Sequence, residues 1–462
     1  MKRIAIIGGG ISGLSAAFAL EKRRQAGASL EYTLFEASSR LGGVLVTEWA
    51  DGCLLEAGPD SFLTEKPWAS DLSLEVGLGD QLIGSNDADR KTYILVKGRL
   101  VVMPDGLMFM VPTKMTPTAL SPLFSARTKM RMAREWFHPP RKAEADETVA
   151  SFVERHYGSE MVDRLADPLL SGVYGGEASQ LSVRAVLPRF AEMEATHGSL
   201  GRAMLSARKK MALGSNKPTG SIFTSLKSGM QQLTEAVVAR LTPSSLLTNA
   251  PVEAIQREGD SWIISAGFKT DEFDAVILAV PAHSAASLLR MCSRELSAEV
   301  ASIEYSSSIT VALGYDLAVR RSLPSGFGFL VPRSEGKRLL AATFVHNKFP
   351  HRAPEDRALL RCFFAGSNAA SVWDLSDEGI IAVVKNDLRQ ILGLAADPLF
   401  SRVYKWKSAM AQYTVGHLDR LARIDRLCQQ LPGIALAGNA YRGIGVPDCV
   451  RSGRDAVQQL LS

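Results

Sequence analysis

The chain has 462 residues, 46% of them hydrophobic, and a formal net charge of +5 at pH 7. This length and composition exclude a disordered protein and a single small core, and they predict two or three packed units. The basic residues are spread along the chain instead of forming one tract, which argues against nucleic-acid binding.

The spacing of the cysteines and the length of the apolar stretches indicate the cellular compartment. The five cysteines lie far apart and form no CxxC pair, which predicts free thiols in a reducing compartment and no metal site. The opening MKRIAIIGGG runs directly into a strand and a glycine turn, without the features of a signal peptide. Apolar stretches fall short of the ~20 residues that span a bilayer. We therefore expect a cytoplasmic protein, and peripheral contact with the inner membrane stays open.

The N-terminal pattern predicts a βαβ unit. Residues 3–7 form a short apolar strand, and residues 11–24 continue after a glycine turn with helical spacing. Residues 33–37 (TLFEA) predict the second strand.

The middle of the chain predicts a helical insertion. Residues 103–137 are rich in Met, Pro and basic residues, and residues 146–170 have a helical periodicity that Asp146 is expected to open. Residues 208–221 are rich in Gly, Ser and Pro and predict a loop, which leads into an amphipathic helix from Gly229.

The second half predicts a return to the first sheet and then a second sheet. Residues 252–273 alternate as a hairpin, and residues 275–280 (AVILAV) predict a parallel strand buried on both faces. Residues 434–439 and the segment from Gly443 predict a last strand and helix. Four other strands predict a largely antiparallel sheet, at residues 309–315, 326–332, 338–345 and 359–365.

A glycine pattern joins the first predicted strand and helix. Gly8, Gly10 and Gly13 give GxGxxG. In a dinucleotide-binding unit the first glycine makes the turn, the second admits the pyrophosphate and the third allows close packing. The helix N-terminus then presents free N–H groups to the phosphates. The pattern alone is weak, because other tight turns also use glycine.

Glu36 strengthens this interpretation because it ends the second predicted strand at the expected distance from the glycines. A carboxylate there accepts hydrogen bonds from the ribose hydroxyls of an adenosine and repels a 2′-phosphate. The expected cofactor is therefore FAD or NAD and not NADP.

Three further motifs distinguish FAD from NAD. Residues 40–43 (RLGG) complete an E-x3-R-x-G-G pattern with Glu36, residues 56–61 read EAGPDS, and residues 436–439 (LAGN) precede GIGVPD at 443–448. These motifs resemble those of the amine-oxidase-like flavoproteins. The resemblance implies that they lie at the flavin's diphosphate, beside the isoalloxazine and at its pyrimidine end. A helix N-terminus at the last position would stabilise reduced, anionic flavin.

A narrower resemblance covers essentially the whole chain. It rests on DPLLSGVYGGEASQLSVRAVLPRFAEMEATHGSL (167–200), GFGFLVPRSEGKRLLAATF (326–344) and WKSAMAQYTVGHL (406–418). These blocks resemble the protoporphyrinogen and coproporphyrinogen oxidase family of the flavin amine oxidase superfamily. Asp60 stands where the mitochondrial and plastid enzymes carry Arg, as in the soluble bacterial branch, which prefers coproporphyrinogen III.

The resemblance implies a mixed α/β (α+β) fold. Its parts are a Rossmann-like FAD-binding domain of the amine-oxidase and hydroxybenzoate-hydroxylase type, an antiparallel-sheet substrate domain and a helical domain that could face a membrane. We assign residues 1–62, 222–288 and 405–462 to the first, residues 63–98, 176–221 and 289–404 to the second, and residues 99–175 to the third.

The resemblance also implies non-covalent FAD. Val252 would contact the adenine and Trp406 would lie against the flavin. We assign no catalytic side chain, because the chemistry belongs to the flavin. The expected cofactor-binding residues are Gly8, Gly9, Gly10, Ile11, Ser12, Gly13, Glu36, Ala37, Arg40, Gly43, Val44, Gly58, Pro59, Asp60, Ser61, Val252, Trp406, Asn439, Ile444, Gly445 and Val446.

Two kinds of residue are candidates for substrate binding. Phe327 and Leu330 would line a cavity for a flat apolar macrocycle, with ordinary sheet core as the alternative. Basic side chains would pair with substrate propionates, although such residues are also common on solvated surfaces. The candidates are Lys66 and, ranked with it, Arg184, Arg208, Lys209 and Lys210.

The implied reaction is an FAD- and oxygen-dependent six-electron oxidation of a porphyrinogen to a porphyrin in haem biosynthesis. Meso carbons would give hydride to the flavin, pyrrole protons would leave to solvent, and oxygen would reoxidise the flavin with release of hydrogen peroxide. Aromatisation would drive the reaction. Coproporphyrinogen III is slightly favoured, and protoporphyrinogen IX stays open.

Other functions and partners also stay open. A flavin-dependent amine oxidase shares the fold and would use paired aromatic side chains, of which Tyr441 could be one. A carotenoid desaturase and a non-catalytic flavin-binding partner of haem enzymes are further alternatives. Ferrochelatase or another haem-pathway enzyme is a candidate partner, and the chain could be a monomer or a homodimer.

Overall fold

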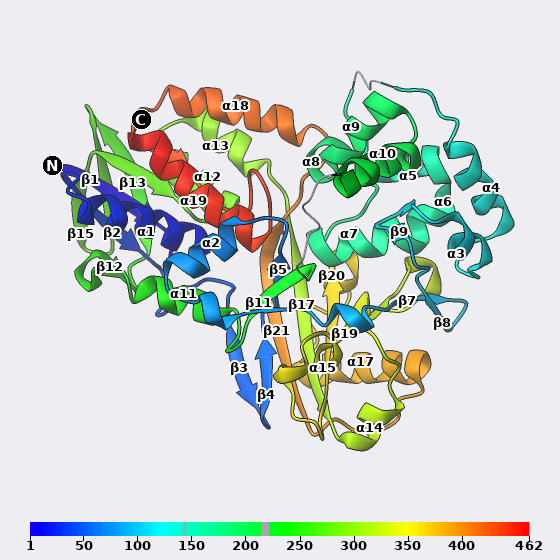
Figure 1. Cartoon of the computed structure of the whole chain (residues 1–462). Coiled ribbons are helices and arrows are strands. Elements are labelled where there is room, and N and C mark those ends of the chain that lie inside the picture. The colour runs from blue at the N-terminus through cyan, green and yellow to red at the C-terminus, as the bar shows by residue number, and fades with distance from the viewer. Residues whose placement is uncertain (142–144, 214–220, 462) are drawn as a thin grey trace.

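A computed structural model describes residues 1–141, 145–213 and 221–461 (Figure 1). One end of the molecule is built on a five-stranded parallel sheet, which confirms the predicted βαβ unit and the buried parallel strand. Its strands, in spatial order, are β12 (Leu246–Leu247), β2 (Leu30–Phe35), β1 (Lys2–Ile7), β16 (Ala275–Leu278) and β22 (Ile434–Leu436).

Both faces of this sheet are covered, which explains why its strands are almost continuously apolar. Ile4 and Ile6 of β1 pack on one face, in the same core cluster as parts of helices α1 (Ile11–Gln25) and α19 (Val446–Leu461). Ala5 and Ile7 alternate to the other face and join a second cluster. That face is covered by β13 (Val252–Glu258), β14 (Ser261–Ala266), β15 (Lys269–Phe273), α12 (Ala282–Leu289), α13 (Arg294–Ala301) and α18 (His417–Gln429).

The second half of the molecule is organised by a seven-stranded mixed sheet, in which only β7 and β18 pair in parallel. The four predicted strands are confirmed as β17, β18, β19 and β20. Helix α17 (Asp377–Leu392) packs on one face through an apolar cluster of its own. The strand order is β21 (Phe400–Ala411), β17 (Tyr305–Tyr315), β20 (Ala358–Ala365), β19 (Ala341–Phe344), β18 (Gly328–Leu330), β7 (Thr92–Val96) and β8 (Arg99–Val102).

Smaller elements connect the two halves. Hairpin β3–β4 leads into the turn at residues 56–61, and β11 returns the chain to helix α11, near the predicted amphipathic helix. Their bounds are β3 (Thr47–Ala50), β4 (Cys53–Glu56), β5 (Phe62–Leu63), β6 (Leu82–Gly84), β9 (Leu107–Met108), β10 (Val111–Pro112), β11 (Phe223–Leu226), α2 (Trp68–Glu75), α11 (Gln231–Val238), α14 (Leu317–Ser322), α15 (Val345–Lys348) and α16 (Gly366–Ala370).

The helical region lies beside the seven-stranded sheet (Figure 1). It continues beyond residue 175, and the helix that ends at Leu213 replaces the first part of the predicted loop at 208–221; residues 214–220 lie outside the described residues. The domain boundaries remain a prediction. The helices are α3 (Met115–Leu120), α4 (Ala126–Glu135), α5 (Val149–Tyr157), α6 (Ser159–Met161), α7 (Asp167–Tyr174), α8 (Val183–Val186), α9 (Pro188–His197) and α10 (Leu200–Leu213).

The expectation that Asp146 opens a helix is wrong. Helix α5 begins at Val149 and is capped by the hydroxyl of Thr148. The Asp146 carboxylate instead accepts hydrogen bonds from Ser182 Oγ at 2.7 Å and from the N–H of Gly416 at 3.1 Å. These partners are distant in sequence, so local capping rules could not identify them.

A buried ionic cluster joins three helices of this region. The side chain of His156 is fully buried, and its two ring nitrogens lie 3.4 Å from Glu135 and 3.3 Å from Glu194. Arg155 also pairs with Glu194. Burial would lower the pKa of His156, but the two carboxylates raise it above its ordinary value. Burial alone would raise the pKa of Glu194, but the hydrogen bonds and charges of His156 and Arg155 lower it to about 2.

We expect His156→Gln to lower the midpoint of thermal unfolding strongly at pH 6 and less at higher pH. Breaking a buried ion pair costs about 3–5 kcal/mol. The contribution of a histidine with a raised folded pKa is complete below its unfolded pKa and is lost as pH rises through the folded pKa. Unfolding midpoints measured from pH 5 to 9 test this, with the exposed His197→Gln as control. A difference that stays constant with pH would contradict it.

Candidate functional site

The turn after β1 is shaped by glycines with different tasks. Gly8 has φ +108°, and a Cβ there would lie 2.5 Å from the carbonyl oxygen of Ala279; a Cβ at Gly13 would overlap the carbonyl oxygen of Gly8. Gly10 is the N-cap of α1, and a Cβ there would have no heavy-atom neighbour within 4 Å. Gly8 and Gly13 therefore serve close packing, whereas Gly10 borders open space at a helix N-terminus.

The remaining residues of the first motif lie around this turn. Glu36 follows β2, and its carboxylate accepts the N–H of Gly9 at 2.7 Å and the N–H and hydroxyl of Ser38 at 2.8 Å each. It is half-buried at the opening of the turn, where a ribose hydroxyl could reach it. Ile11 and Ser12 are buried in the first turn of α1, and Ala37 is exposed.

The second loop contacts the first. A Cβ at Gly43 would lie 3.1 Å from Gly10 Cα, and the N–H of Gly42 donates to the carbonyl of Gly9 at 2.8 Å. The Arg40 guanidinium donates to the carbonyls of Leu41, at 2.9 Å, and of Gly43. Arg40 therefore stabilises its own loop against the glycine turn.

The third turn continues the same surface. A Cβ at Gly58 would overlap the carbonyl oxygen of Val44, so the two segments pack backbone to backbone. Trp406 of β21 donates its indole N–H to the carbonyl of Ala57 at 2.9 Å. One continuous line of contacts, the floor of the candidate site, thus runs from Gly10 through Gly43, Val44 and Gly58 to Trp406. These residues come from segments that are far apart in the sequence.

The C-terminal motif is held by two tyrosines. Tyr305 donates its hydroxyl to Asn439 Oδ1 at 3.2 Å, and Tyr413 donates to the Asn439 carbonyl at 2.8 Å. The N–H of Gly443 donates to the Tyr413 hydroxyl at 2.7 Å. Ile444 and Gly445 are half-buried just before α19, which packs closely along α1. The predicted first and last motifs therefore lie on neighbouring elements.

This arrangement fits a dinucleotide. The space at Gly10 and the N–H groups at the start of α1 suit a pyrophosphate. Glu36 is a carboxylate that a ribose hydroxyl could reach, and the N-terminus of α19 would provide a positive dipole at the other end of the candidate site. Val252 is half-buried at the start of β13, opposite Ala266, and its expected adenine contact remains a prediction.

The candidate substrate residues lie in different places. Phe327, which directly precedes β18, is 8% exposed. Leu330, the last residue of β18, is half-buried. Lys66 pairs with Asp448, in the first turn of α19, at 2.5 Å, and the Lys66 side chain remains 40% exposed. Lys66 therefore lies at the C-terminal motif. Arg184 is half-buried in α8 and Lys209 is exposed in α10, whereas the side chains of Arg208 and Lys210 lie outside the described residues.

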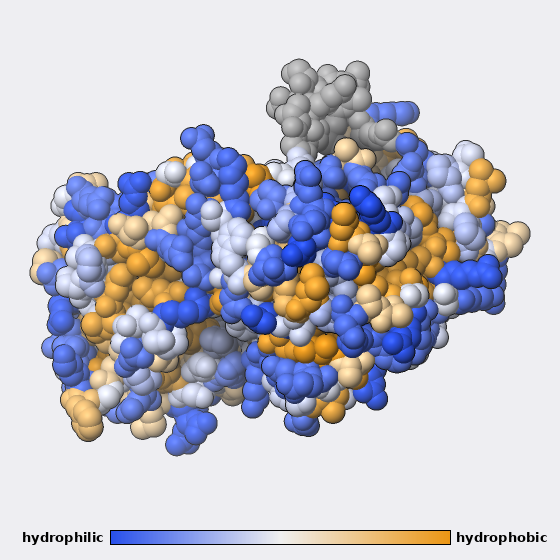
Figure 2. All heavy atoms as spheres, turned by 90° about the horizontal axis from the view of Figure 1, so that it is seen from below, coloured by the Kyte–Doolittle hydropathy of each residue, from blue (hydrophilic) through white to orange (hydrophobic). Residues whose placement is uncertain are grey.

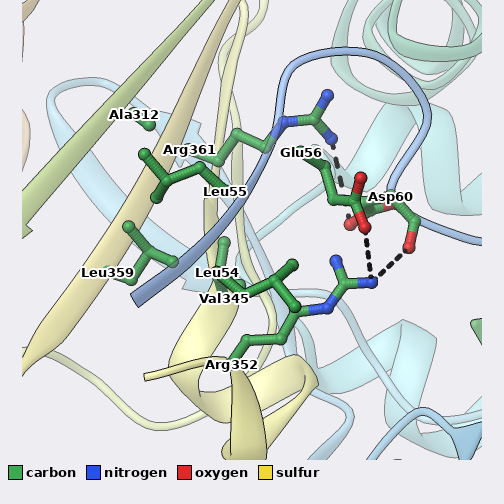
Figure 3. A pocket seen from close by; sticks show the side chains of 9 residues that line it. All are labelled: Leu54, Leu55, Glu56, Asp60, Ala312, Val345, Arg352, Leu359 and Arg361. Atoms are coloured by element: carbon green, nitrogen blue, oxygen red, sulfur yellow. Dashed lines mark hydrogen bonds and ion pairs between the residues drawn. The ribbon is translucent and has the colours of Figure 1, made fainter. Parts of the chain in front are cut away.

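Sequence reasoning placed Asp60 and Ser61 beside the flavin and missed the partners of Asp60. Its carboxylate pairs with Lys348 Nζ at 2.9 Å, and Arg361 Nη1 lies 3.9 Å away. Figure 3 shows Arg352 and Arg361 on either side of Glu56 and Asp60. Burial alone would raise the pKa of Asp60, but the neighbouring cations hold it below its ordinary value. Burial raises the pKa of Glu56 to about 7.

One sequence signal pointed to this cluster. Arg361 interrupts the otherwise apolar run LLRCFF at residues 359–364, which becomes the buried strand β20. A charged residue inside such a run needs a buried partner. The identity of that partner depends on the fold.

Tyr441, the candidate for an amine-oxidase cage, is 3% exposed and packs in the core beside the parallel sheet. Burial raises its pKa well above the ordinary value. Its carbonyl lies 3.0 Å from Nε2 of buried His417. Tyr441 is therefore a core side chain and does not face an open substrate site.

Other functional features are limited to what the described ranges contain. Among residues 1–141, 145–213 and 221–461, no three His, Cys, Asp or Glu side chains gather as a possible metal site. Within the same ranges, each helix is too short or too polar to cross a membrane. The five cysteines are unpaired thiols. Figure 2 shows one face of the molecule, where hydrophobic residues form separate patches among hydrophilic ones.

Comparisons with known proteins agree with this site. The sequence profile described as flavin containing amine oxidoreductase matches residues 11–461. Coproporphyrinogen III oxidase of Bacillus subtilis (strain 168) is 34% identical, with 100% of this chain and 98% of that protein covered. Protoporphyrinogen oxidase 1, chloroplastic, of Arabidopsis thaliana is 31% identical, with 96% and 85% covered. The crystal structure of a protein assigned as a protoporphyrinogen oxidase from Exiguobacterium sp. 255-15 has a TM-score of 0.88 and 32% identity, with 99% and 98% covered.

The matches extend over nearly the whole chain, and the structural similarity includes both sheets and the helical region. The glycine turns, the carboxylate after β2 and the N-terminus of α19 fit FAD, which is the cofactor of this fold. The chain belongs to the flavin-containing amine oxidoreductase family, in the group that includes the coproporphyrinogen and protoporphyrinogen oxidases.

Proposed function

We propose that this protein oxidises coproporphyrinogen III to coproporphyrin III, with FAD as cofactor and oxygen as acceptor. The observation that carries the proposal is the 34% identity to a coproporphyrinogen III oxidase over the full length of both chains. Asp60 and the buried Tyr441 support it further, because the former matches the bacterial branch and the latter leaves no exposed aromatic cage at that position. Protoporphyrinogen IX is the second candidate substrate.

Bound FAD supplies hydride acceptance from the meso carbons and electron transfer to oxygen. The chain's residues bind and orient. Gly10 and the start of α1 would hold the pyrophosphate, and Glu36, which accepts the N–H of Gly9, would also accept from the ribose. Trp406 fixes the turn at Ala57 through its indole N–H. Aromatisation of the macrocycle drives the loss of hydrogen. The residues therefore need only position the substrate and let its pyrrole protons pass to solvent.

Lys66 is the best placed of the proposed propionate ligands. Its ammonium lies at the N-terminus of α19, beside Asp448, and is partly exposed. We expect Lys66→Met to raise KM for coproporphyrinogen III about tenfold, the loss of one charge-assisted hydrogen bond of ~1.4 kcal/mol. The effect on kcat is expected to be small, and steady-state porphyrin fluorescence measures both.

The exposed Lys22→Met is the control for Lys66, because Lys22 is also paired with a carboxylate but lies on the surface of α1. An unchanged KM in Lys66→Met, or an equal rise in the control, would remove Lys66 from the substrate site.

Location and partners are also proposals. We propose a cytoplasmic protein with peripheral contact at the inner membrane, supported by Leu120 and Phe137, which are 80% and 84% exposed in the helical region near basic helix α4. Ferrochelatase or another haem-pathway enzyme would receive the product, and the chain would act as a monomer or homodimer.

The test of the proposed function compares coproporphyrinogen III, protoporphyrinogen IX and putrescine as substrates of the purified FAD-loaded protein. We expect porphyrin fluorescence with both porphyrinogens, a higher kcat/KM for coproporphyrinogen III, and no peroxide from putrescine. A preference for protoporphyrinogen IX would identify that porphyrinogen as the substrate instead of coproporphyrinogen III. Peroxide from the amine without porphyrin formation would replace the proposal by amine oxidation.

A further inference from the structure

A largely buried charge cluster lies at the turn at residues 56–61 and contains Glu56, Asp60, Lys348, Arg352 and Arg361. Figure 3 shows all of these side chains except Lys348. The two carboxylates belong to β4 and to the turn. The three cations come from α15, the segment after it and β20, which are parts of the seven-stranded-sheet half. The cluster therefore joins this half to a turn of the flavin site.

Each cation contacts the turn directly. Lys348 Nζ lies 2.9 and 3.2 Å from the two Asp60 oxygens and 3.1 Å from Ser61 Oγ. Arg361 donates to the carbonyl of Gly58. Arg352 donates to the carbonyl of Asp60 at 3.0 Å and also reaches Glu56. Movement of the turn would break contacts to all three cations.

The cluster is costly for the fold. Relative exposure is 9% for Lys348, 1% for Arg352 and 7% for Arg361. In the described structure, the Nε atoms of both arginines are buried without a hydrogen-bond partner. Apolar residues of similar size usually stabilise such a site as well or better. Unsatisfied buried groups in a native protein call for an explanation beyond stability.

The cluster contains more cations than carboxylates, whichever protonation state Glu56 adopts. In an interior of low dielectric constant, an unbalanced charge acts over a longer distance than it does in water. The turn above it belongs to the continuous floor that runs from Gly10 through Gly43 and Val44 to Gly58. The turn at 56–61, which we expect beside the flavin, therefore packs directly against this excess of positive charge.

We propose that Lys348 and Arg361 are positioning residues of the redox site, which fix the turn at 56–61 and raise the reduction potential of bound flavin through the excess positive charge below it. A reduced flavin gains electron density, which a fixed nearby positive charge stabilises. The inference rests on the flavin of the family and is independent of which porphyrinogen is oxidised.

The test uses the two partners of one ion pair. Removing the cation in Lys348→Met and the anion in Asp60→Asn changes the local charge in opposite directions with similar side-chain volumes. We expect the flavin potential of the holoenzyme, measured by equilibration with a reference dye without substrate, to fall in Lys348→Met and to rise in Asp60→Asn. The measurement is made at the same pH for all variants.

Two controls accompany the pair. Lys348→Arg keeps the charge and is expected to keep the potential, and Asp51→Asn removes a carboxylate from the partly exposed Arg357–Asp51 pair and is expected to leave the potential unchanged. Shifts of the flavin potential in the same direction in Lys348→Met and Asp60→Asn, or no shift in either, would overturn the proposal. If the ion pair only held the turn in place, breaking it from either side would change the potential in the same direction. If Lys348→Met does not retain FAD, Asp60→Asn decides alone: a rise supports the proposal, and a fall or no change overturns it.

Discussion

Gly10→Ala is expected to fold normally and to lose FAD. A Cβ at Gly10 would meet no protein atom within 4 Å, and the φ of Gly10 is −71°, which alanine adopts readily. The added methyl would instead occupy the space next to the pyrophosphate. Overpacking of this kind costs up to ~3 kcal/mol, which corresponds to a loss of about 100-fold in FAD affinity.

Gly13→Ala provides the contrast. A Cβ there would overlap the carbonyl oxygen of Gly8, which is backbone and cannot rotate away. We expect this variant to lose the thermal transition of the parent, whether or not FAD is added. Thermal unfolding of the apo proteins and titration with FAD distinguish the two effects. Normal FAD affinity in Gly10→Ala would remove this turn from the cofactor site.

Arg352→Met is expected to produce a large loss of stability. Its guanidinium donates to Glu56 at 3.1 Å, to the Asp60 carbonyl at 3.0 Å and to Ser225 Oγ at 2.5 Å. Removing one member of a buried ion pair costs about 3–5 kcal/mol, because the partner stays buried without a counter-charge. The midpoint of thermal unfolding is expected to fall by several degrees.

A second substitution identifies the cause of this loss. Because Glu56 is the carboxylate left unpaired, Glu56→Gln in the Arg352→Met background is expected to recover part of the midpoint. Arg357→Met, at the more exposed Arg357–Asp51 pair, is expected to cost about 1 kcal/mol or less. A double variant that is as unstable as the sum of the two single variants would show that the ion pair does not cause the effect.

The parts of the fold that the sequence predicts are those with local patterns. The GxGxxG turn, the apolar run at 275–280 and the four strands between 309 and 365 each carry their own periodicity or glycine pattern. The two-residue strand β12 has no such pattern, because its place depends on pairing with β2.

The candidate site shows the same division. Gly8, Gly13 and Glu36 lie in motifs whose geometry follows from a few neighbouring residues. Lys348 and Arg361 become neighbours of Asp60 only through folding, since about 300 residues separate each of them from Asp60 in the chain. The expectation for Asp146 fails for the same reason, because Ser182 and Gly416 lie on distant segments.

The most direct test of the account is the stoichiometry of the reaction. The purified FAD-loaded protein is given a limiting amount of anaerobically prepared coproporphyrinogen III, and air is then admitted while porphyrin fluorescence, oxygen and peroxide are followed. The account predicts one coproporphyrin III formed with three molecules of oxygen consumed and three of hydrogen peroxide released. A protein that retains FAD and yields no porphyrin above the uncatalysed rate would contradict it.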